Sequence, residues 1–320
     1  MRGTICAMIT AAAMVLVCSP ASMAAPACCA KDAGAINCGP SCSGSCAGCA
    51  GMKLGTQAYT FRLFTFFEAV DKAKQLGLDF IEVFPGQQVS KDMGDAKMGP
   101  DLTMAQMARI KNKLDEAGIR AIGYGVAGLG KDEAENRKVF DFAKVMGITT
   151  ITAEPPEDSL ELIDRLANEY QINVAIHNHP KPSHYWNPDT VLKAIKNCSK
   201  RTGACADTGH WVRSGLDPLE CLKKLEGRIL WSHFKDLNEK SPNAHDVPWG
   251  TGVCNAKALV TELHRQGFKG GVMAEYEHNW ENSVPDLAKC AEFFTTTYGE
   301  LVKQAKAKET AQEKEDDKQQ

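Results

Sequence analysis

The amino-acid sequence predicts a single (β/α)8 barrel, and three observations support this prediction. First, after residue 51 the chain alternates eight times between an apolar strand-like segment and a helix-like segment, with short breaks between them. Second, these units occupy about 250 residues, the usual size of such a barrel. Third, the first strand is followed by Thr60-Phe-Arg-Leu-Phe64, which is unlike the glycine-rich phosphate turn that usually follows the first strand of a doubly wound open sheet.

The predicted elements follow one another in a regular order along the chain. The expected strands are residues 53–60, 79–85, 120–126, 149–153, 173–178, 203–206, 228–235 and 271–276. The expected helices are residues 65–76, 103–117, 131–146, 158–170, 188–197, 218–225, 255–266 and 284–302. Gly77, Gly118 and Gly147 end three of these helices, and Pro155 and Pro180 break the chain after the fourth and fifth strands.

Residues 1–25 have the pattern of a signal peptide. Arg2 provides the positive start, residues 7–17 form an apolar run, and Ser22-Met-Ala24 or Met23-Ala-Ala25 provides a small-residue cleavage site. The apolar run is too short to span a membrane comfortably, so we expect export to the periplasm or the medium. Membrane association would require a lipid on Cys28, and the residues that precede Cys28 match a lipidation signal poorly.

Residues 26–51 form a linker rich in glycine, serine, alanine and cysteine, and they contain six of the 13 cysteines. In an oxidising compartment this is most simply a disulfide-stapled linker, and a metal knuckle is the alternative, although the segment has no histidine. We expect the barrel at residues 52–302, with its five scattered cysteines in the core. Residues 303–320 should form a charged tail that is either disordered or a frayed helix.

Polar side chains gather at the carboxyl ends of the predicted strands, where barrels of this kind carry their chemistry. The residues at these ends are Gln57, Tyr59, Glu82, Tyr124, Glu154, His177, His179, Asp207, His210, His233, Lys235, Glu275 and Glu277. Carboxylates or imidazoles at so many strand ends are hard to ascribe to folding, because buried charges are costly unless they are paired or metal-bound. In Asp207-Thr-Gly-His210 a glycine lets a carboxylate and an imidazole turn toward one point, as a metal site requires. Either residue could instead cap a helix or satisfy a turn.

Several of these residues also have a purely structural interpretation. Glu82 could pair with Lys235, and Lys235 could pair with Asp236. His177 and His179 could be hydrogen-bonded core histidines. Four tryptophans in or near the predicted loops are either packing residues or sugar-stacking platforms, namely Trp186, Trp211, Trp249 and Trp280.

Together, these motifs resemble the xylose isomerase-like barrel superfamily, which includes sugar phosphate isomerases and epimerases and the family 2 AP endonucleases. The resemblance covers residues 53–301. It rests on five short motifs in order at or near successive strand ends, namely Ile176-His-Asn-His179, Asp207-Thr-Gly-His210, Ser232-His-Phe-Lys-Asp236, Asp246-Val-Pro-Trp-Gly-Thr-Gly252 and Met273-Ala-Glu-Tyr-Glu277.

The resemblance implies a divalent cation, commonly Mn²⁺, Mg²⁺, Co²⁺ or Zn²⁺, held by a mid-barrel glutamate, an aspartate, a histidine and a last-strand glutamate. Asp207, His233 and Glu275 match the last three ligands. The family's usual Glu-Asn-His appears here with His177 in the first position, so either His177 replaces the glutamate or Glu154 reaches in from the preceding strand. A mixed nitrogen and oxygen set suits Mn²⁺, Co²⁺ or Zn²⁺.

The resemblance also implies proton transfer at a carbon next to a carbonyl that the metal polarises. Glu154 and Glu275 are then the acid/base pair, His177 is a third candidate, and Lys235 or His210 stabilises the enediolate oxygen. The residues expected to bind substrate are Glu82, Tyr124, His179, His210, Arg213, Asp236, Asp246 and Trp249.

The leading hypothesis is therefore an exported isomerase or epimerase that acts on a small carbohydrate, with a homo-oligomer compatible with the sequence. A lyase or hydrolase that uses the same enolisation on a 3-keto glycoside is the alternative. An abasic-site endonuclease is disfavoured, because a net charge of −3, a pI near 6.3 and the lack of a basic stripe do not suit nucleic acid. A sugar-binding protein without catalysis stays a further alternative, and the presence of both glutamates and the histidines favours an enzyme over it.

Overall fold

The computed structural model describes residues 51–319. The predicted signal peptide, the cysteine-rich linker up to residue 50 and Cys28 lie outside the described residues. Among residues 51–319 there is no helix with both the length and the apolar composition needed to cross a bilayer. The five cysteines of this range are free thiols, and four of them are buried, as expected for core residues.

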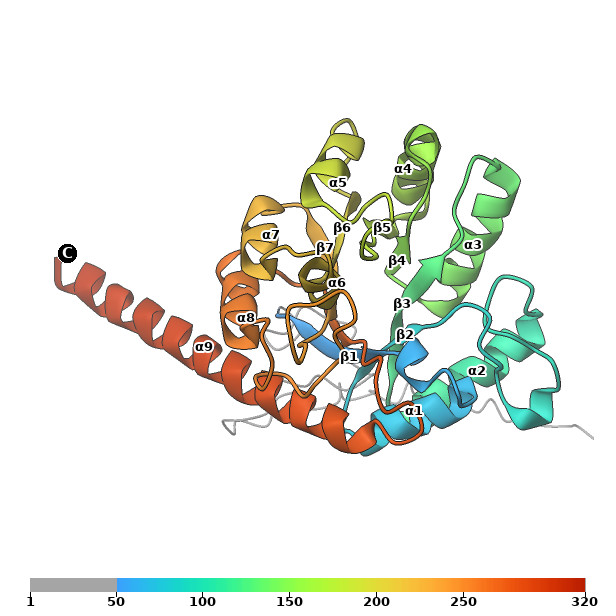
Figure 1. Cartoon of the computed structure of the whole chain (residues 1–320), viewed down its shortest axis with the longest axis horizontal. Coiled ribbons are helices and arrows are strands. Elements are labelled where there is room, and N and C mark those ends of the chain that lie inside the picture. Colours follow the sequence, from blue (N-terminus) through green and yellow to red (C-terminus); the bar gives the residue numbers. More distant parts are fainter. Residues whose placement is uncertain (1–50, 320) are drawn as a thin grey trace, which may run out of the picture. The chain divides into compact units, whose positions relative to one another are not determined.

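Eight parallel strands close into a barrel in chain order (Figure 1). The strands are β1 (Lys53–Gln57), β2 (Phe80–Val83), β3 (Arg120–Ala127), β4 (Thr150–Ala153), β5 (Asn173–Ile176), β6 (Thr202–Asp207), β7 (Ile229–Phe234) and β8 (Gly271–Ala274). The barrel closes where β1 pairs with β8, with Lys53 beside Gly271 and Thr56 beside Ala274. The predicted (β/α)8 barrel is therefore confirmed.

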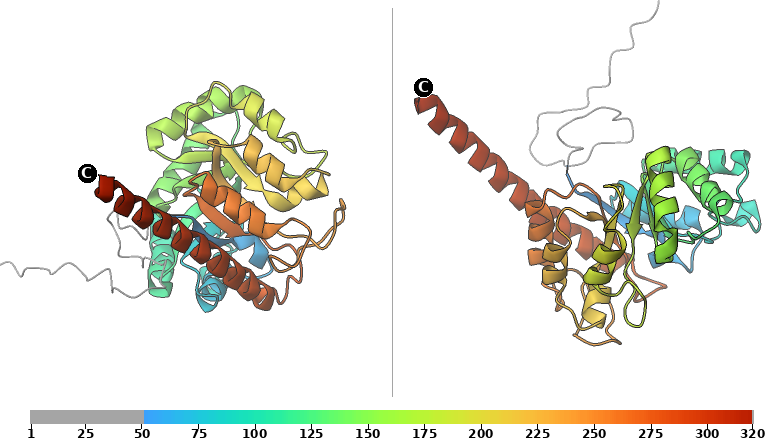
Figure 2. Two further views of the ribbon diagram at one scale, coloured as in Figure 1. Left: turned by 90° about the vertical axis from the view of Figure 1, so that its left-hand side faces the viewer. Right: turned by 90° about the horizontal axis from the view of Figure 1, so that it is seen from above.

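The helices lie outside the sheet, as the two further views in Figure 2 show. They are α1 (Phe66–Gln75), α2 (Met104–Ala117), α3 (Glu133–Met146), α4 (Leu160–Tyr170), α5 (Pro188–Ala194), α6 (Thr208–Arg213), α7 (Pro218–Lys224), α8 (Ala256–Arg265) and α9 (Val284–Gln319). The helices from α1 to α4 and from α6 to α9 contact one another in chain order, so much of the sheet is covered by a helical layer.

Local sequence explains where the helices begin and end. Thr65 and Thr103 start α1 and α2 with capping boxes, in which Glu68 and Gln106 bond back to the cap backbone. Gly118 ends α2 in the left-handed conformation, with a φ of 74°. A residue with a Cβ would adopt this φ only under strain. These ends are encoded by short motifs, which is why the helix positions could be read from the sequence.

The barrel interior is filled in layers, with an apolar layer below the polar mouth. The apolar layer is formed by Phe80, Ile122, Ala175, Cys205, Trp231 and Met273. A larger apolar cluster fills the space between the strands and the helices. Because side chains alternate in direction along a strand, the inward residues two positions further on lie one layer higher, at the carboxyl end of the barrel.

Two elements differ from the sequence-based expectation. Helix α6 was not predicted, because Asp207-Thr-Gly-His210 looked like a turn. In the structure Asp207 caps a short helix, its Oδ1 accepting the backbone N–H of His210 at 2.7 Å. The last helix continues beyond the expected end at residue 302 as far as Gln319, so of the two expectations for the tail, helix or disorder, the helix is observed. Its alanine, lysine, glutamate and glutamine residues are strong helix formers.

Candidate active site

The polar side chains at the barrel mouth lie two residues beyond the apolar layer on several strands. On β7, Trp231 belongs to the apolar layer, His233 lies one layer higher, and Lys235 follows just beyond the strand. On β8, Met273 belongs to the apolar layer and Glu275 follows just beyond the strand end. The same spacing of two residues separates the lower and upper layers on β5 and β6, so the predicted alternation brings these ionisable groups to the barrel mouth.

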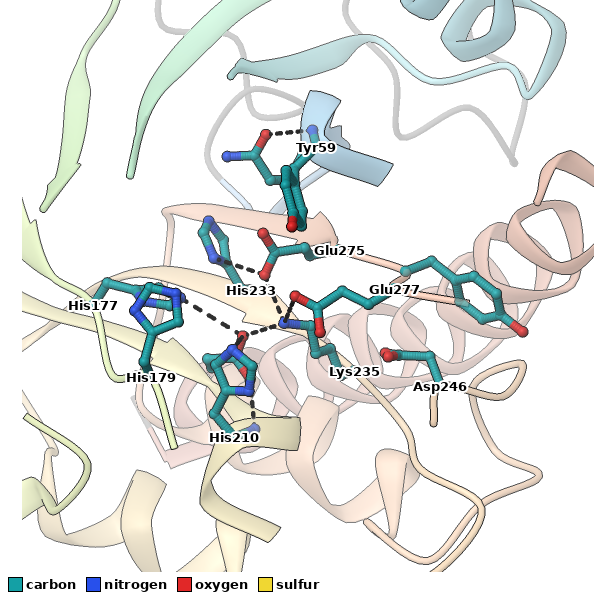
Figure 3. A network of polar contacts seen from close by, with 12 residues as sticks. Tyr59, His177, His179, His210, His233, Lys235, Asp246, Glu275 and Glu277 are labelled. Atoms are coloured by element: carbon teal, nitrogen blue, oxygen red, sulfur yellow. Dashed lines mark hydrogen bonds and ion pairs between the residues drawn. The ribbon is translucent and has the colours of Figure 1, made fainter. Parts of the chain in front are cut away.

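Lys235 lies at the centre of the cluster. Its Nζ is 2.6 Å from Asp207 Oδ2, 2.6 Å from Glu275 Oε2 and 3.4 Å from Glu277 Oε1 (Figure 3). Burial opposes the charged form of Lys235, but the carboxylates of Asp207 and Glu275 hold its pKa well above the usual value. The ammonium therefore neutralises part of the negative charge that converges here.

His177 is held from behind by a carboxylate and has one ring nitrogen without a partner. Its Nδ1 lies 3.2 Å from Glu154 Oε1, so Nδ1–H donates to that carboxylate. Its Nε2 is buried, lies 3.7 Å from Asp207 Oδ2 and makes no hydrogen bond. Burial lowers the pKa of His177, but the contacts with Asp207 and Glu154 outweigh it and raise the pKa overall.

His233 repeats this arrangement with its two nitrogens exchanged. Its Nε2 lies 2.8 Å from Glu82 Oε2, while the buried Nδ1 makes no hydrogen bond and lies 3.2 Å from Glu275 Oε2. Burial disfavours the imidazolium, yet Glu82 and Glu275 hold the pKa of His233 well above its usual value. Two buried imidazoles thus each have a supporting carboxylate on one side and, on the other, a nitrogen that makes no hydrogen bond but faces a second carboxylate.

This arrangement fits a divalent cation. Unpaired buried ring nitrogens are costly unless something binds them, and the nitrogens of His177 and His233 lie beside the carboxylates of Asp207 and Glu275. A carboxylate behind a histidine is the usual support of a metal-ligating imidazole. Ligand atoms lie within 4.8 Å of one another in three groups, namely His177–Asp207–His210–Glu275, His177–Cys205–His233 and Glu154–His177–His179.

Glu154 supports the two histidines of the His-Asn-His motif. Its carboxylate accepts hydrogen bonds from the ring of His177, the backbone N–H and ring of His179, and the hydroxyl of Ser183 at 2.7 Å. Burial raises the pKa of Glu154, but the hydrogen bonds from His177 and His179 outweigh it and hold that pKa far below the usual range. Both oxygens of Glu154 are thus occupied by donors, so this geometry favours a supporting role for Glu154.

Glu82 supports His233 in the same way, and the structure does not bring it to Lys235. Its fully buried carboxylate accepts hydrogen bonds from Trp231 Nε1 at 2.6 Å, Thr152 Oγ1 at 2.8 Å and His233 Nε2 at 2.8 Å. Three donors on one carboxylate fix its orientation. Glu82 therefore lies beneath the mouth and orients His233.

On the β8 side of the mouth, Arg213 connects several of the predicted substrate-binding residues. Its guanidinium lies 2.9 Å from Asp246 Oδ2, 2.8 Å from Glu277 Oε2 and 3.1 Å from His210 Nδ1. Burial raises the pKa of Asp246 to about 7. Burial also lowers the pKa of His210 well below its usual value.

Tyr124 lies away from the cluster, although it was expected to bind substrate. It packs edge-on against Phe142 of α3, with ring centroids 5.0 Å apart. The register between β2 and β3 shifts at Ile81 and Glu82, and Gly123 rather than Tyr124 faces Trp231 in the interior. This irregularity breaks the period-2 rule on which the expectation depended.

Asp236 and Trp249 also lie outside the cluster, because they build the loop between β7 and α8. Asp236 Oδ2 accepts the N–H groups of Gly250 at 2.9 Å and Gly252 at 3.0 Å. The buried ring of Trp249 packs against Phe234, with centroids 4.6 Å apart. Both residues shape the loop that carries Asp246.

Sequence reasoning missed Asn178, the central residue of the His-Asn-His motif. Its side-chain amide donates to the carbonyl of Asp207 at 3.0 Å and accepts the N–H of Asp207 at 2.8 Å. It thereby links the end of β5 to the end of β6 and places Asp207 beside His177. Its position between two candidate site residues was the available clue.

Comparison with known proteins identifies the family of this chain. Residues 70–295 match the family described as the xylose isomerase-like TIM barrel. The chain belongs to that family. The resemblance inferred from the strand-end motifs is thus confirmed.

Three similar proteins illustrate the range of the family. The chain is 26% identical to an inosose dehydratase of Bacillus cereus (strain AH820) over 138 residues, which are 38% of this chain and 46% of that enzyme, so it spans about half the length of the curated relatives it matches. A solved, uncharacterised protein of Parabacteroides distasonis ATCC 8503 is 37% identical, with a TM-score of 0.63 over 76% of this chain and 97% of that one. The IOLI protein, solved with a zinc atom, is 16% identical, with a TM-score of 0.59 over 78% and 98% of the two chains.

Proposed function

We propose that this chain is a divalent-metal-dependent enzyme that removes a proton next to the carbonyl of an uncharged keto sugar, as a sugar isomerase or epimerase. The observation that carries the proposal is that two inward ring nitrogens make no hydrogen bond, namely His177 Nε2 and His233 Nδ1. Each ring is fixed by a carboxylate and faces the oxygens of Asp207 or Glu275. These four residues would hold the metal. Two nitrogens and two oxygens suit Zn²⁺, Co²⁺ or Mn²⁺ better than Mg²⁺.

When bound, the cation supplies the Lewis acidity that polarises a carbonyl and acidifies the neighbouring C–H bond. The chain's own residues must then move the proton. Glu275 is the proposed base, because its hydrogen bond and ion pairs within residues 51–319 all involve Oε2. Oε1 is therefore the oxygen left to accept a proton from the substrate.

A cation and a hydrogen-bond donor lie near this base. The ammonium of Lys235 lies beside Glu275 and Asp207, where its positive charge can stabilise an oxygen that gains negative charge. His210 faces the same region, with its Nε2 3.6 Å from Asp207 Oδ2. Proton removal and charge stabilisation are thus assigned to different residues at one mouth.

The charge of the cluster supports an uncharged substrate. Its carboxylates are Glu82, Glu154, Asp207, Asp246, Glu275 and Glu277, and its permanent cations are Lys235 and Arg213. Both cations are already paired with carboxylates, so a phosphate group would meet repulsion rather than a binding site. We therefore propose free or keto sugars rather than sugar phosphates.

Elimination is the second candidate reaction, and the match to an inosose dehydratase favours it. Removal of the same proton can expel a hydroxyl or glycosidic oxygen from the neighbouring carbon instead of leading to an isomer. The first steps of the two reactions make identical demands on Glu275 and Lys235. A 3-keto glycoside lyase or hydrolase would follow from the same site.

Export is part of the proposal, and it rests on the pattern of residues 1–25. N-terminal sequencing of the protein recovered from cell envelope and medium fractions tests it. A mature chain that begins near residue 26 supports export, whereas an intact Met1 in the cytoplasmic fraction contradicts it. Mass spectrometry of the same peptide reveals whether Cys28 carries a lipid.

Hydrogen–deuterium exchange followed by NMR tests the chemistry. The Zn²⁺-, Co²⁺- or Mn²⁺-loaded protein is incubated in deuterated water with a panel of free and 3-keto sugars. We expect exchange at one carbon of one sugar, and a decrease of about 10²- to 10⁴-fold in Glu275→Gln, which keeps the size but not the basicity of the side chain. Exchange that leads to an isomer identifies an isomerase, and loss of water or an alcohol identifies elimination.

The matched control is Glu157→Gln, the same change at a carboxylate that pairs with His184 outside the cluster. It should leave exchange unchanged. No exchange on any sugar by protein with verified metal content would overturn the proposed function.

A further inference from the structure

One ring nitrogen of His210 faces the barrel mouth, and the other ring nitrogen faces Arg213. Both residues lie on α6, and their side chains are at most one-tenth exposed. Arg213 Nη1 lies 3.1 Å from His210 Nδ1, and His210 Nε2 lies 3.6 Å from Asp207 Oδ2. Figure 3 shows His210 among the residues that surround Lys235. The ring therefore has an Arg213 side and a cluster side.

The Arg213 side is fixed, because the guanidinium is held by several acceptors at once. Nε donates to the carbonyl of Ala244 at 3.1 Å, Nη1 to Glu277 Oε2 at 2.8 Å and Nη2 to Asp246 Oδ2 at 2.9 Å. These contacts come from the loop after β7 and from the end of β8. The remaining Nη1–H points at His210 Nδ1, and the guanidinium cannot rotate away without breaking two ion pairs.

An arginine side chain has five N–H donors and no acceptor. The ring nitrogen that faces it must therefore carry a lone pair, because an N–H at His210 Nδ1 would put two donors 3.1 Å apart. In the neutral ring the proton is then on Nε2, the nitrogen on the cluster side. The groups near this side are Asp207, His177, His179 and Lys235.

We propose that Arg213 is a positioning residue that holds His210 in the Nε2–H tautomer, so that His210 acts as a neutral hydrogen-bond donor to the substrate oxygen. This inference rests on the proposed function, since that oxygen belongs to the keto sugar. It also excludes His210 as a metal ligand through Nε2, although its ligand atoms lie within reach of those of His177, Asp207 and Glu275. Ligation would need the lone pair on Nε2 and the proton on Nδ1, against Arg213.

A neutral donor has a specific advantage in this reaction. An imidazole N–H can stabilise developing negative charge on an oxygen without giving up its proton, and it adds no further positive charge beside Lys235. The tautomer matters because the opposite one would present a lone pair to the same oxygen and repel it. Arg213 thus acts on the substrate through His210 and not by direct contact.

NMR of the ring nitrogens tests the tautomer directly. The mature protein is labelled with ¹⁵N-histidine and loaded with Zn²⁺, and the His210 signals are assigned by their absence in His210→Gln. We expect a pyrrole-type Nε2 and a pyridine-type Nδ1. If the wild-type protein shows a pyrrole-type Nδ1 or a metal-bound Nε2, that result by itself overturns the proposal.

Variants at Arg213 test its role. Arg213→Met removes the donor, so we expect both tautomers of His210 and a decrease of about 10- to 100-fold in kcat for exchange, with a smaller change in KM. Arg213→Lys keeps a donor-only cation and should retain most of the Nε2–H form. Asp246→Asn removes one ion pair but not the Nη1 contact, so the tautomer should not change.

Two outcomes separate this inference from the proposed function. If no sugar exchanges but the ¹⁵N spectra are as expected, the function fails and the tautomer assignment stands. If exchange occurs and Arg213→Met leaves the His210 tautomer unchanged in a folded protein, Arg213 only secures Asp246 and Glu277, and the inference is wrong.

Discussion

At the scale of single residues, the orientation of two imidazoles determines what the cluster can bind. Glu154 accepts from Nδ1 of His177, whereas Glu82 accepts from Nε2 of His233, so the rings present opposite nitrogens to the centre. Either ring turned over would replace an inward lone pair with an N–H group. The supporting carboxylates would therefore orient the proposed metal ligands.

The role of Glu154 can be separated from that of an acid/base residue. Glu154→Gln keeps a carbonyl oxygen for His177 but loses the charge, so we expect metal affinity to fall about 10- to 100-fold. At saturating metal, turnover should return to within about tenfold of wild type. Competition titration with a chelating dye and deuterium exchange measure the two effects.

Glu157→Gln again provides the matched control, because Glu157 lies outside the cluster. A loss of about 10²- to 10⁴-fold in turnover at saturating metal, with affinity unchanged, would instead assign Glu154 the acid/base role expected from the sequence.

At the scale of elements, short polar motifs set the geometry that the site requires. Asp207 ends β6, caps α6 through Oδ1 and presents Oδ2 to Lys235, so one carboxylate links strand, helix and cluster. The six-residue α6 then places His210 and Arg213 three positions apart, on one side of the helix. A helix so short has little stability of its own, and these contacts hold it in place.

The capping box of α1 provides a test of stability that does not involve the site. The backbone N–H of Thr65, the ammonium of Lys91 and the hydroxyl of Thr65 lower the pKa of Glu68 to about 2. A carboxylate with a lowered pKa in the folded state stabilises the protein above its unfolded pKa and loses this effect as the pH falls. Glu68→Gln should therefore lower the Tm at pH 7, and the difference from wild type should shrink as the pH falls from 4.5 toward 3.

Thermal melts followed by circular dichroism between pH 7 and pH 3 measure this difference. Glu116→Gln is the control, because Glu116 is exposed and its side chain forms no ion pair among residues 51–319. A difference between Glu68→Gln and wild type that stays constant over this pH range would mean that Glu68 does not titrate as the capping geometry requires. Thr65→Ala should destabilise by about 1 kcal/mol.

At the scale of the whole molecule, the barrel gathers residues that lie far apart in the sequence. Glu82 and His233 are 151 positions apart, and Lys235 and Glu275 are 40 apart, yet each pair is in hydrogen-bond contact. Closure between β1 and β8 completes the ring of strand ends that carries these groups. The site therefore exists only in the folded barrel.

Metal binding should accordingly stabilise the barrel. A ligand that binds only the folded state adds about 2.7 kcal/mol at a concentration of 100 times Kd, so removal of the metal should lower the Tm. The barrel is closed by strand pairing and filled by apolar clusters that do not include the proposed metal ligands, and we therefore expect the metal-free protein to remain folded. Scanning fluorimetry before and after chelation, with elemental analysis, measures the change.

His177→Ala provides the control for the metal effect. It removes one unpaired inward nitrogen, and its Tm should change much less with Zn²⁺ than the wild-type Tm does. An identical Tm with and without metal in the wild-type protein, with complete removal verified, would contradict a metal site in this cluster.

The segment before the barrel should be dispensable for folding and metal binding. A protein that lacks residues 25–50 keeps the bond from the N–H of Met52 to the hydroxyl of Tyr298 at 3.2 Å and the pairing of β1 with β8. We expect its Tm and Zn²⁺ affinity to match those of the full mature chain. Failure to fold, or folding without metal binding, would show that the cysteine-rich segment is integral to the barrel.

The sequence by itself determined the strand–helix order, the closed barrel and the residue types at the mouth. These features depend on local patterns, namely capping motifs, glycine ends and the period-2 alternation that places Trp231 and His233 on the same inner face. The family followed from the same strand-end motifs. Each of these inferences needs only residues close together in the chain.

The contacts of these residues could not be predicted from the sequence. The choice between His177 and Glu154, the tautomer of His210 and the burial of Glu82 beneath His233 depend on contacts between distant segments. Tyr124 points outward because of a register shift between β2 and β3. Such a shift reverses the direction of the side chains that follow it, and the local alternation of apolar and polar residues does not reveal it. Directions and partners are set by packing across the barrel, and local patterns do not contain that information.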